Sequence, residues 1–170
     1  LDGFDLDYEP SFGGDSYTTE MMRTFIDVMS KYLGPKCDEQ YKVDGKHKLL
    51  VVDGQWNDAE YADRFDYFIG QAYSASSESS LNGRCQNGYQ DYGKGFPNEK
   101  RIFCEWVSKV GNAFGQGGVR YRYDNEYIPS LWGMAHYAAE SPNNVAGCGA
   151  YVLQFGYAEG NHLNLPVPPN

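Results

Sequence analysis

One pattern recurs along the chain and restricts its fold more than any other feature. A short apolar run rich in β-forming residues is followed by a loop of Gly, Asn, Ser or Asp, and then by a stretch with helical spacing. This order is typical of repeated strand–helix units. The run KLLVVD at 48–53 is almost wholly apolar, as in parallel strands that are covered on both faces. The predicted strands are residues 1–9, 48–53, 67–73, 101–106 and 149–157.

Helical segments are expected between these strands. The first follows a cap at Ser16 or Thr18, and Gly34-Pro35 ends it. Its apolar residues at helical spacing are Met22, Phe25, Ile26, Met29 and Leu33. A short helix is predicted near residues 59–65 and a longer one at 130–140, with a polar loop at 74–92.

Five parallel strands with intervening helices indicate an α/β fold, but a complete (β/α)8 TIM barrel needs about 200 residues or more. The 170 residues therefore predict the second half of such a barrel, as a single domain over 1–170. The chain also begins directly on a strand, as if the preceding half were missing. An open doubly wound sheet is the alternative, although no glycine-rich phosphate loop follows any strand.

Charge and cysteine spacing argue against several kinds of partner. With 14 basic and 23 acidic residues, the formal charge of −9 would repel nucleic acid and anionic lipid. No segment approaches the ~20 apolar residues of a membrane span. The four cysteines form no C-x-x-C pair and have no histidines at ligand spacing, so zinc is not expected. Free thiols are favoured over disulfides, because Cys104 and Cys148 lie in stretches with buried-strand character.

The strongest functional signal is the octet DGFDLDYE at 2–9. Side chains alternate along a strand, so Asp5, Asp7 and Glu9 project to one face, with successive acids about 6 to 7 Å apart. Three like charges in a confined space do not all ionise near neutral pH. We expect Glu9 to hold the proton, since it lies nearest the C-terminal end of the strand, where such barrels bind substrates. The alternatives are acids that are merely solvated, or a cation site.

This octet resembles the fourth-strand signature DGxDxDxE of family 18 glycoside hydrolases, the chitinases and endo-β-N-acetylglucosaminidases. The resemblance weakens after Glu9 but implies that the chain supplies strands four to eight of the barrel. It also implies that Glu9 is the general acid/base and that Asp7 orients the acetamido group of the substrate. The carbonyl oxygen of that group attacks the anomeric carbon in a retaining, substrate-assisted mechanism. Asp5 tunes the proton held between Asp7 and Glu9, and no cofactor or metal is implied.

Further site residues follow from the resemblance. Gln71-Ala72-Tyr73 resembles the sixth strand of the family, so Tyr73 is the candidate hydrogen-bond donor to the acetamido oxygen, or else a core or rim tyrosine. Gln71 shares the face of Tyr73 by period two. Glu105 lies at the cleft end of the seventh strand, or else belongs to a structural ion pair. The other predicted substrate-binding residues are Trp56, Gln154 and Tyr157.

The last strand departs from the chitinase pattern. Family chitinases usually end it with a Trp beneath the reacting sugar, whereas here it ends Gln154-Phe155-Gly156-Tyr157. We therefore expect an endo-β-N-acetylglucosaminidase that cuts a β-1,4 linkage next to N-acetylglucosamine in N-glycans, with a chitinase as the alternative. A sugar-binding barrel without catalysis is the alternative of another class.

The expected partners are an oligosaccharide or glycoprotein glycan and the N-terminal half of the barrel, with neither nucleic acid nor a membrane span. Family resemblance and glycan chemistry together suggest an exported bacterial protein that is periplasmic, cell-surface or secreted.

Overall fold

The structure is a computed structural model that describes residues 1–10, 19–71, 92–106, 121–123, 126–128 and 145–151. The chain divides into two compact units, Leu1–Gly70 with Gln90–Arg101, and Gln71–Tyr89 with Ile102–Asn170. Among the described residues, no helix is long and apolar enough to cross a membrane. Over the same ranges, no group of three or more His, Cys, Asp or Glu side chains is arranged to hold a metal ion.

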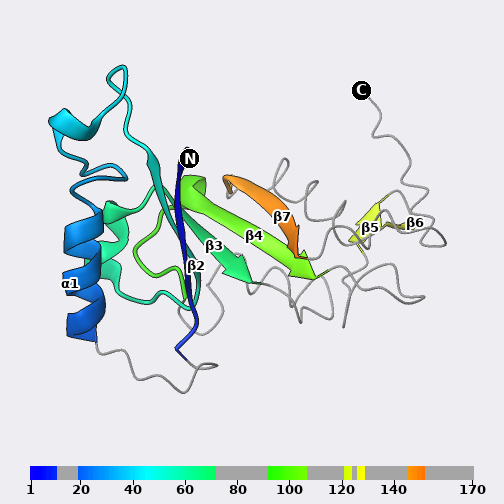
Figure 1. The fold of residues 1–170 in the computed structure, drawn as a ribbon. Coiled ribbons are helices and arrows are strands. Elements are labelled where there is room, and N and C mark those ends of the chain that lie inside the picture. The colour runs from blue at the N-terminus through cyan, green and yellow to red at the C-terminus, as the bar shows by residue number, and fades with distance from the viewer. Residues whose placement is uncertain (11–18, 72–91, 107–120, 124–125, 129–144, 152–170) are drawn as a thin grey trace. The chain divides into compact units, whose positions relative to one another are not determined.

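Three parallel strands begin the fold: β1 (Gly3–Tyr8), β2 (Leu49–Gly54) and β3 (Tyr67–Gln71) (Figure 1). All three lie where apolar and β-branched runs predicted strands. β1 pairs with β2 in a register that sets Asp7 beside Asp53. β2 pairs in turn with β3, which sets Asp53 beside Ile69.

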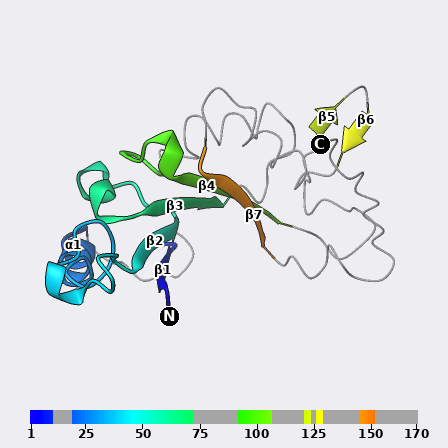
Figure 2. The same ribbon diagram turned by 90° about the horizontal axis from the view of Figure 1, so that it is seen from above.

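The hydrophobic core lies between these strands and α1 (Thr19–Met29), which covers one face of them in both views (Figures 1 and 2). Strand alternation sends Leu50, Val52 and Phe68 to that face, where each is at most 2% exposed. Met22 and Ile26 of α1 pack against them from one side of the helix. Each fully buried side chain of this kind stabilises the fold by about 1.5–3 kcal/mol. The other buried members of the cluster are Trp56, Ala62, Phe65 and Phe96.

α1 is shorter than its apolar spacing predicted. It ends at Met29, and Leu33 instead forms a parallel bridge with Lys48. Gly34 follows with φ +76°, a left-handed conformation that favours glycine, and its N–H donates to Lys48 O at 2.7 Å. Leu33 N–H still donates to Met29 O at 3.0 Å, but the chain beyond Met29 pairs with the segment before β2 and does not continue as α-helix. The predicted cap residues of α1 lie outside the described residues.

The short helix predicted at 59–65 is the 3-10 helix η2 (Ala59–Arg64). Asp58 caps it by accepting a hydrogen bond from Glu60 N–H at 3.3 Å. The same carboxylate accepts two hydrogen bonds from the Arg23 guanidinium of α1, at 2.7 and 3.0 Å. This bidentate pair links η2 to α1. Two further 3-10 helices are η1 (Glu39–Tyr41) and η4 (Asn98–Lys100).

β4 (Arg101–Trp106) and β7 (Gly147–Tyr151) also pair in parallel, and both overlap predicted strands. The sequence patterns did not predict the antiparallel pair of β5 (Tyr121–Tyr123) and β6 (Glu126–Ile128). The sequence did contain a usable signal, because the polar pair Asp124-Asn125 separates two tyrosine-containing triplets, a spacing typical of a hairpin. The helix predicted at 130–140 and the end of the predicted strand at 149–157 lie outside the described residues.

Two of the four cysteines have described side chains, Cys37 and Cys104, and neither forms a disulfide, as predicted. Cys37 is buried and its Sγ–H donates to the carbonyl of Tyr32 at 3.2 Å. A Cβ added at Gly149 would stand 2.8 Å from Cys104 Sγ, so this glycine leaves room for the sulfur.

Candidate active site

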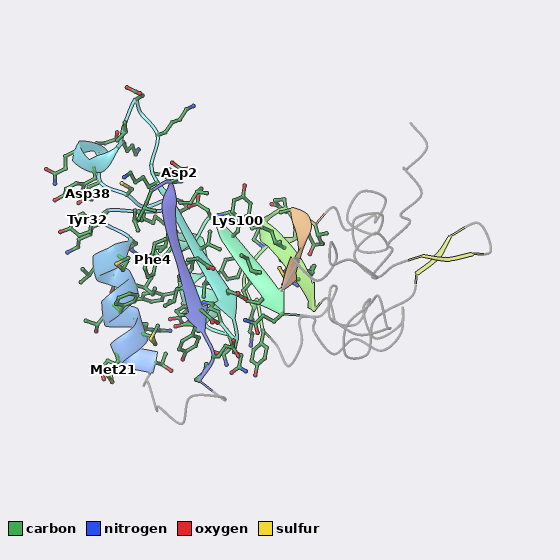
Figure 3. The ribbon with its side chains drawn as sticks, turned by 45° about the vertical axis from the view of Figure 1, so that its right-hand side comes forward. Asp2, Phe4, Met21, Tyr32, Asp38 and Lys100 are labelled. Carbon is green, nitrogen blue, oxygen red and sulfur yellow. The ribbon has the colours of Figure 1, made fainter. Side chains whose placement is uncertain are left out.

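Three carboxylates share one face of β1 and β2. Asp5 and Asp7 alternate with apolar residues along β1, and Asp53 of β2 stands in register with Asp7. Residues in register on parallel strands point to the same face of the sheet. Phe4, which precedes Asp5, lies on the α1 side of β1 (Figure 3). The acids therefore belong to the face of these strands that is opposite to α1.

The proximity of these acids affects the pKa of Asp5. Burial raises the pKa of Asp5 above its ordinary value of 3.8, and the negative charge of Asp7 raises it further. Asp5 consequently holds a proton more readily than an isolated aspartic acid does. The expectation that Glu9 holds a proton near neutral pH stays a prediction.

Glu9 lies at the C-terminal end of the parallel strands. It directly follows Tyr8, the last residue of β1, and is half-buried. The Tyr8 carbonyl accepts a hydrogen bond from Gln55 N–H at 2.8 Å, so β1 stays attached to the chain beyond the end of β2. This contact holds the Tyr8–Glu9 peptide against the segment that follows Asp53.

Asp53 is a candidate site residue that the sequence patterns did not single out. In the sequence it ends an otherwise apolar run and opens a polar stretch, Asp53 to Asn57, that follows the predicted strand. The structure pairs it with Asp7 on one side and Ile69 on the other, and its Oδ1 atom is buried. The sequence offers one signal, which is that Asp53 lies at the C-terminal end of a predicted parallel strand, where such barrels bind substrates.

Gln71 is the last residue of β3 and is half-buried. Alternation gives it the face of Ile69, which stands in register with Asp53. Its predicted contact with the sugar stays a prediction. Glu105 lies in β4 beside Ala150 of β7, and only its backbone position is described. Tyr73, Gln154 and Tyr157 lie outside the described residues.

Trp56 requires a correction, because its position does not support the predicted contact with substrate. Its side chain is 2% exposed and packs edge-on against Tyr8 and Phe65, with ring centroids 5.6 and 5.1 Å away. Its indole N–H donates to Asp58 O at 3.0 Å. With the side chain 2% exposed and the indole N–H bonded to Asp58 O, no indole face is open to a sugar.

The family follows from comparison with known proteins. The family model described as glycoside hydrolase family 18, BT1044-like, matches residues 1–164. The chain belongs to glycoside hydrolase family 18. The resemblance predicted from DGFDLDYE is thereby confirmed, and that octet contains β1 and Glu9 of this family 18 chain. No curated protein matches the chain in sequence.

Solved structures resemble this family 18 chain in fold. A selenomethionine form of a BT1044 variant gives a TM-score of 0.60 at 22% identity, over 92% of this chain and 48% of that one. An endo-β-N-acetylglucosaminidase from Cordyceps militaris in its apo form gives 0.59 at 22% identity, over 96% and 51%. A double mutant of the Cordyceps militaris enzyme, in complex with fucosyl-N-acetylglucosamine-Asn, gives 0.58 at 20% identity, over 96% and 51%. The chain thus spans about half the length of these structures, and family and neighbours together indicate a TIM-barrel fold.

Proposed function

We propose that the intact protein is a retaining glycosidase that cleaves the β-1,4 linkage next to N-acetylglucosamine and acts on N-glycans as an endo-β-N-acetylglucosaminidase. The observation that carries this proposal is the shared face of Asp5 and Asp7 at the strand leading to Glu9, in a family 18 chain. Similar solved structures include an endo-β-N-acetylglucosaminidase, once in complex with fucosyl-N-acetylglucosamine-Asn. The ligand in that complex supports an N-glycan as the substrate class.

Glu9 is the general acid and base of the proposed reaction. It protonates the glycosidic oxygen, and the bond from the anomeric carbon to that oxygen breaks as the acetamido carbonyl oxygen attacks the same carbon. Water then opens the cyclised acetamido intermediate and loses its proton to Glu9. Two displacements at one carbon leave the anomeric configuration unchanged.

Asp7 orients the acetamido group in this proposal. It lies on the same strand as Glu9, beside the acid rather than across the sugar ring from it. A direct nucleophile would need to stand on the opposite face of the sugar, about 5 Å from the acid. Asp5, whose pKa is raised by burial and by the negative charge of Asp7, is proposed to tune the proton at the catalytic acid.

Substrate contacts come from the ends of several strands. Gln71 supports this, because it shares the acidic face and ends its strand at the same edge of the sheet as Glu9. Tyr73 is proposed to donate to the acetamido oxygen. Glu105, Gln154 and Tyr157 are proposed to contact the glycan, on the family resemblance alone.

The proposal includes a second polypeptide segment that completes the barrel. This chain would supply strands four to eight, consistent with its spanning about half of the similar structures. Apolar side chains on β1 and α1 support the idea: Phe4 is 43% exposed, Met21 56% and Val28 51%. Figure 3 shows Phe4 and Met21 on these two elements. A neighbouring strand and helix would cover such a surface in a closed barrel.

The proposal is tested by assaying the intact protein on an asparagine-linked N-glycan and on a chitin oligosaccharide. We expect the N-glycan to be cut between its two core N-acetylglucosamine residues with retained configuration. Glu9→Gln should lower kcat by about 10²- to 10⁴-fold, because it removes the proton donor and keeps the shape. Glu39→Gln is the matched control, since its side chain is 86% exposed on η1, and it should leave kcat unchanged.

Each alternative has a distinct outcome. Preferred cleavage of the chitin oligosaccharide would favour a chitinase, and glycan binding without hydrolysis would favour a non-catalytic barrel. If Glu9→Gln keeps activity within about tenfold of the parent, Glu9 is not the acid. A thiazoline mimic of the cyclised intermediate should inhibit competitively, whereas a covalent sugar adduct on Asp7 or Glu105 would refute the substrate-assisted mechanism.

A further inference from the structure

Gly54, the last residue of β2, lies against the peptide that carries Glu9. A Cβ built on Gly54 would stand 2.7 Å from Tyr8 O, 3.2 Å from Tyr8 C and 3.1 Å from Glu9 Cγ. Real Cβ atoms essentially never approach another atom closer than 3.0 Å. The missing side chain of Gly54 is therefore what allows the backbone of β2 to approach the end of β1 this closely.

The backbone conformation also requires glycine at this position. Gly54 has φ +99°, which residues with a Cβ rarely adopt. The conformation turns the chain so that the next N–H, that of Gln55, donates to Tyr8 O at 2.8 Å. One carbonyl oxygen thus accepts a hydrogen bond from Gln55 while lying in close contact with Gly54.

A methyl group at Gly54 would move Glu9. The clash with Tyr8 O is a clash with backbone, so a side-chain rotation does not relieve it. Displacing that carbonyl displaces the peptide bond it belongs to, whose nitrogen is that of Glu9. The contact with Glu9 Cγ pushes the side chain in addition.

We propose that Gly54 is a positioning residue for the catalytic acid: its close approach to Tyr8 O and Glu9 Cγ sets where the Glu9 carboxyl stands. This inference rests on the proposed function, in which Glu9 is the proton donor. It adds a residue on a second strand that acts through Glu9 without touching the substrate.

Two other glycines provide matched controls for Gly54→Ala. Gly95 has φ +86° and its Cβ would meet backbone atoms of Ala59 at 2.8 Å, so Gly95→Ala combines the same strain with the same kind of clash. Gly45 has φ +73° with no described atom within 4 Å of the added Cβ, so Gly45→Ala introduces the backbone strain alone. Neither residue lies in the proposed catalytic machinery.

The experiment measures thermal unfolding, kcat and KM of the intact protein and these three variants on an N-glycan substrate. We expect Gly54→Ala and Gly95→Ala both to lower the unfolding temperature. Only Gly54→Ala should also lower kcat, by about 10- to 100-fold, because a displacement of about 1 Å costs that much in a positioned acid. Its KM should change little, since the glycan contacts remain. If folded Gly54→Ala keeps the kcat of the parent, as Gly95→Ala should, Gly54 is only a structural glycine.

A second measurement needs no Gly54 variant to fold. If Glu9 Cγ packs on Gly54, Glu9→Ala should speed hydrogen exchange of Gln55 N–H, whereas Glu9→Gln, which keeps Cγ, should not. An unchanged exchange rate in Glu9→Ala would overturn the positioning role. If Glu9→Gln retains hydrolysis, Glu9 is not the proton donor and the proposed function fails. The exchange rate of Gln55 N–H would still test the contact between Glu9 and Gly54.

Discussion

The substitution Trp56→Ala should lower the free energy of unfolding and leave binding at the proposed glycan site unchanged. Trp56 is 2% exposed and contacts Tyr8 and Phe65 edge-on, at centroid distances of 5.6 and 5.1 Å. Removing a large aromatic side chain from such a core costs about 3–5 kcal/mol in the free energy of unfolding. Trp56→Phe keeps most of the ring packing but loses the indole N–H bond to Asp58 O, a loss of about 1–2 kcal/mol.

Equilibrium urea unfolding of the intact protein measures both values, with KM determined on the same samples. Phe65→Ala is the reference for the core, because Phe65 is fully buried in the same cluster. We expect Trp56→Ala to resemble Phe65→Ala in stability and to leave the KM of the folded fraction unchanged. A stability loss below about 1 kcal/mol combined with a raised KM would refute the core assignment and restore the predicted sugar contact.

Three further predictions concern the strands and their acids. Ile26→Ala should lower the free energy of unfolding by about 2–5 kcal/mol in urea titrations, since Ile26 is 0% exposed; a value below this range would mean that the core relaxes around the cavity. Asp66→Ala should cost about 1–3 kcal/mol, because Asp66 Oδ2 accepts from Leu50 N–H at 2.9 Å, and Asp66→Asn, which keeps an acceptor, should cost less. Asp7→Asn should lower the pKa of Asp5 without restoring it to 3.8, because burial, the larger cause, remains; an unchanged carboxyl titration by NMR would contradict this. A raised folded-state pKa means that Asp5 favours unfolding above that pKa and that stability is gained as pH falls through it toward 3.8, so this gain should shrink in Asp7→Asn.

The parallel strands were predictable because composition, length and side-chain alternation all indicate a strand at the same residues. The apolar run that contains Leu50 and Val52 has both the composition and the length of a buried strand, and both residues are buried in β2. The alternation of Asp5 and Asp7 along β1 likewise followed from period two alone. The end of α1 was not predictable in this way. Leu33 fits the helical spacing, but its pairing with Lys48 is a long-range contact that local propensity does not contain.

Two residues show why residue type alone does not predict which side chains belong to the site. Trp56 follows a strand end, where an aromatic ring suits either a sugar or the core, and only the positions of Tyr8 and Phe65 decide between them. Asp53 was passed over because its relation to Asp7 depends on the register between two strands, which is set by pairing and not by either strand alone. The same limit applies to Gly54, whose contact with Glu9 joins residues far apart in the chain.

The described core of β1, β2 and β3 lies on the face of these strands that α1 covers. Along each strand, one set of alternate residues therefore packs the core and the other set faces the candidate site. In this numbering the core positions are even, as at Val52 and Phe68, and the acidic face is odd, as at Asp7, Asp53 and Gln71. A mutant library that randomises only the odd positions around the acids would therefore vary the proposed site while keeping the core intact. Among natural relatives, substitutions at the even positions should be limited by core packing, and substitutions at the odd positions should be limited by ligand binding.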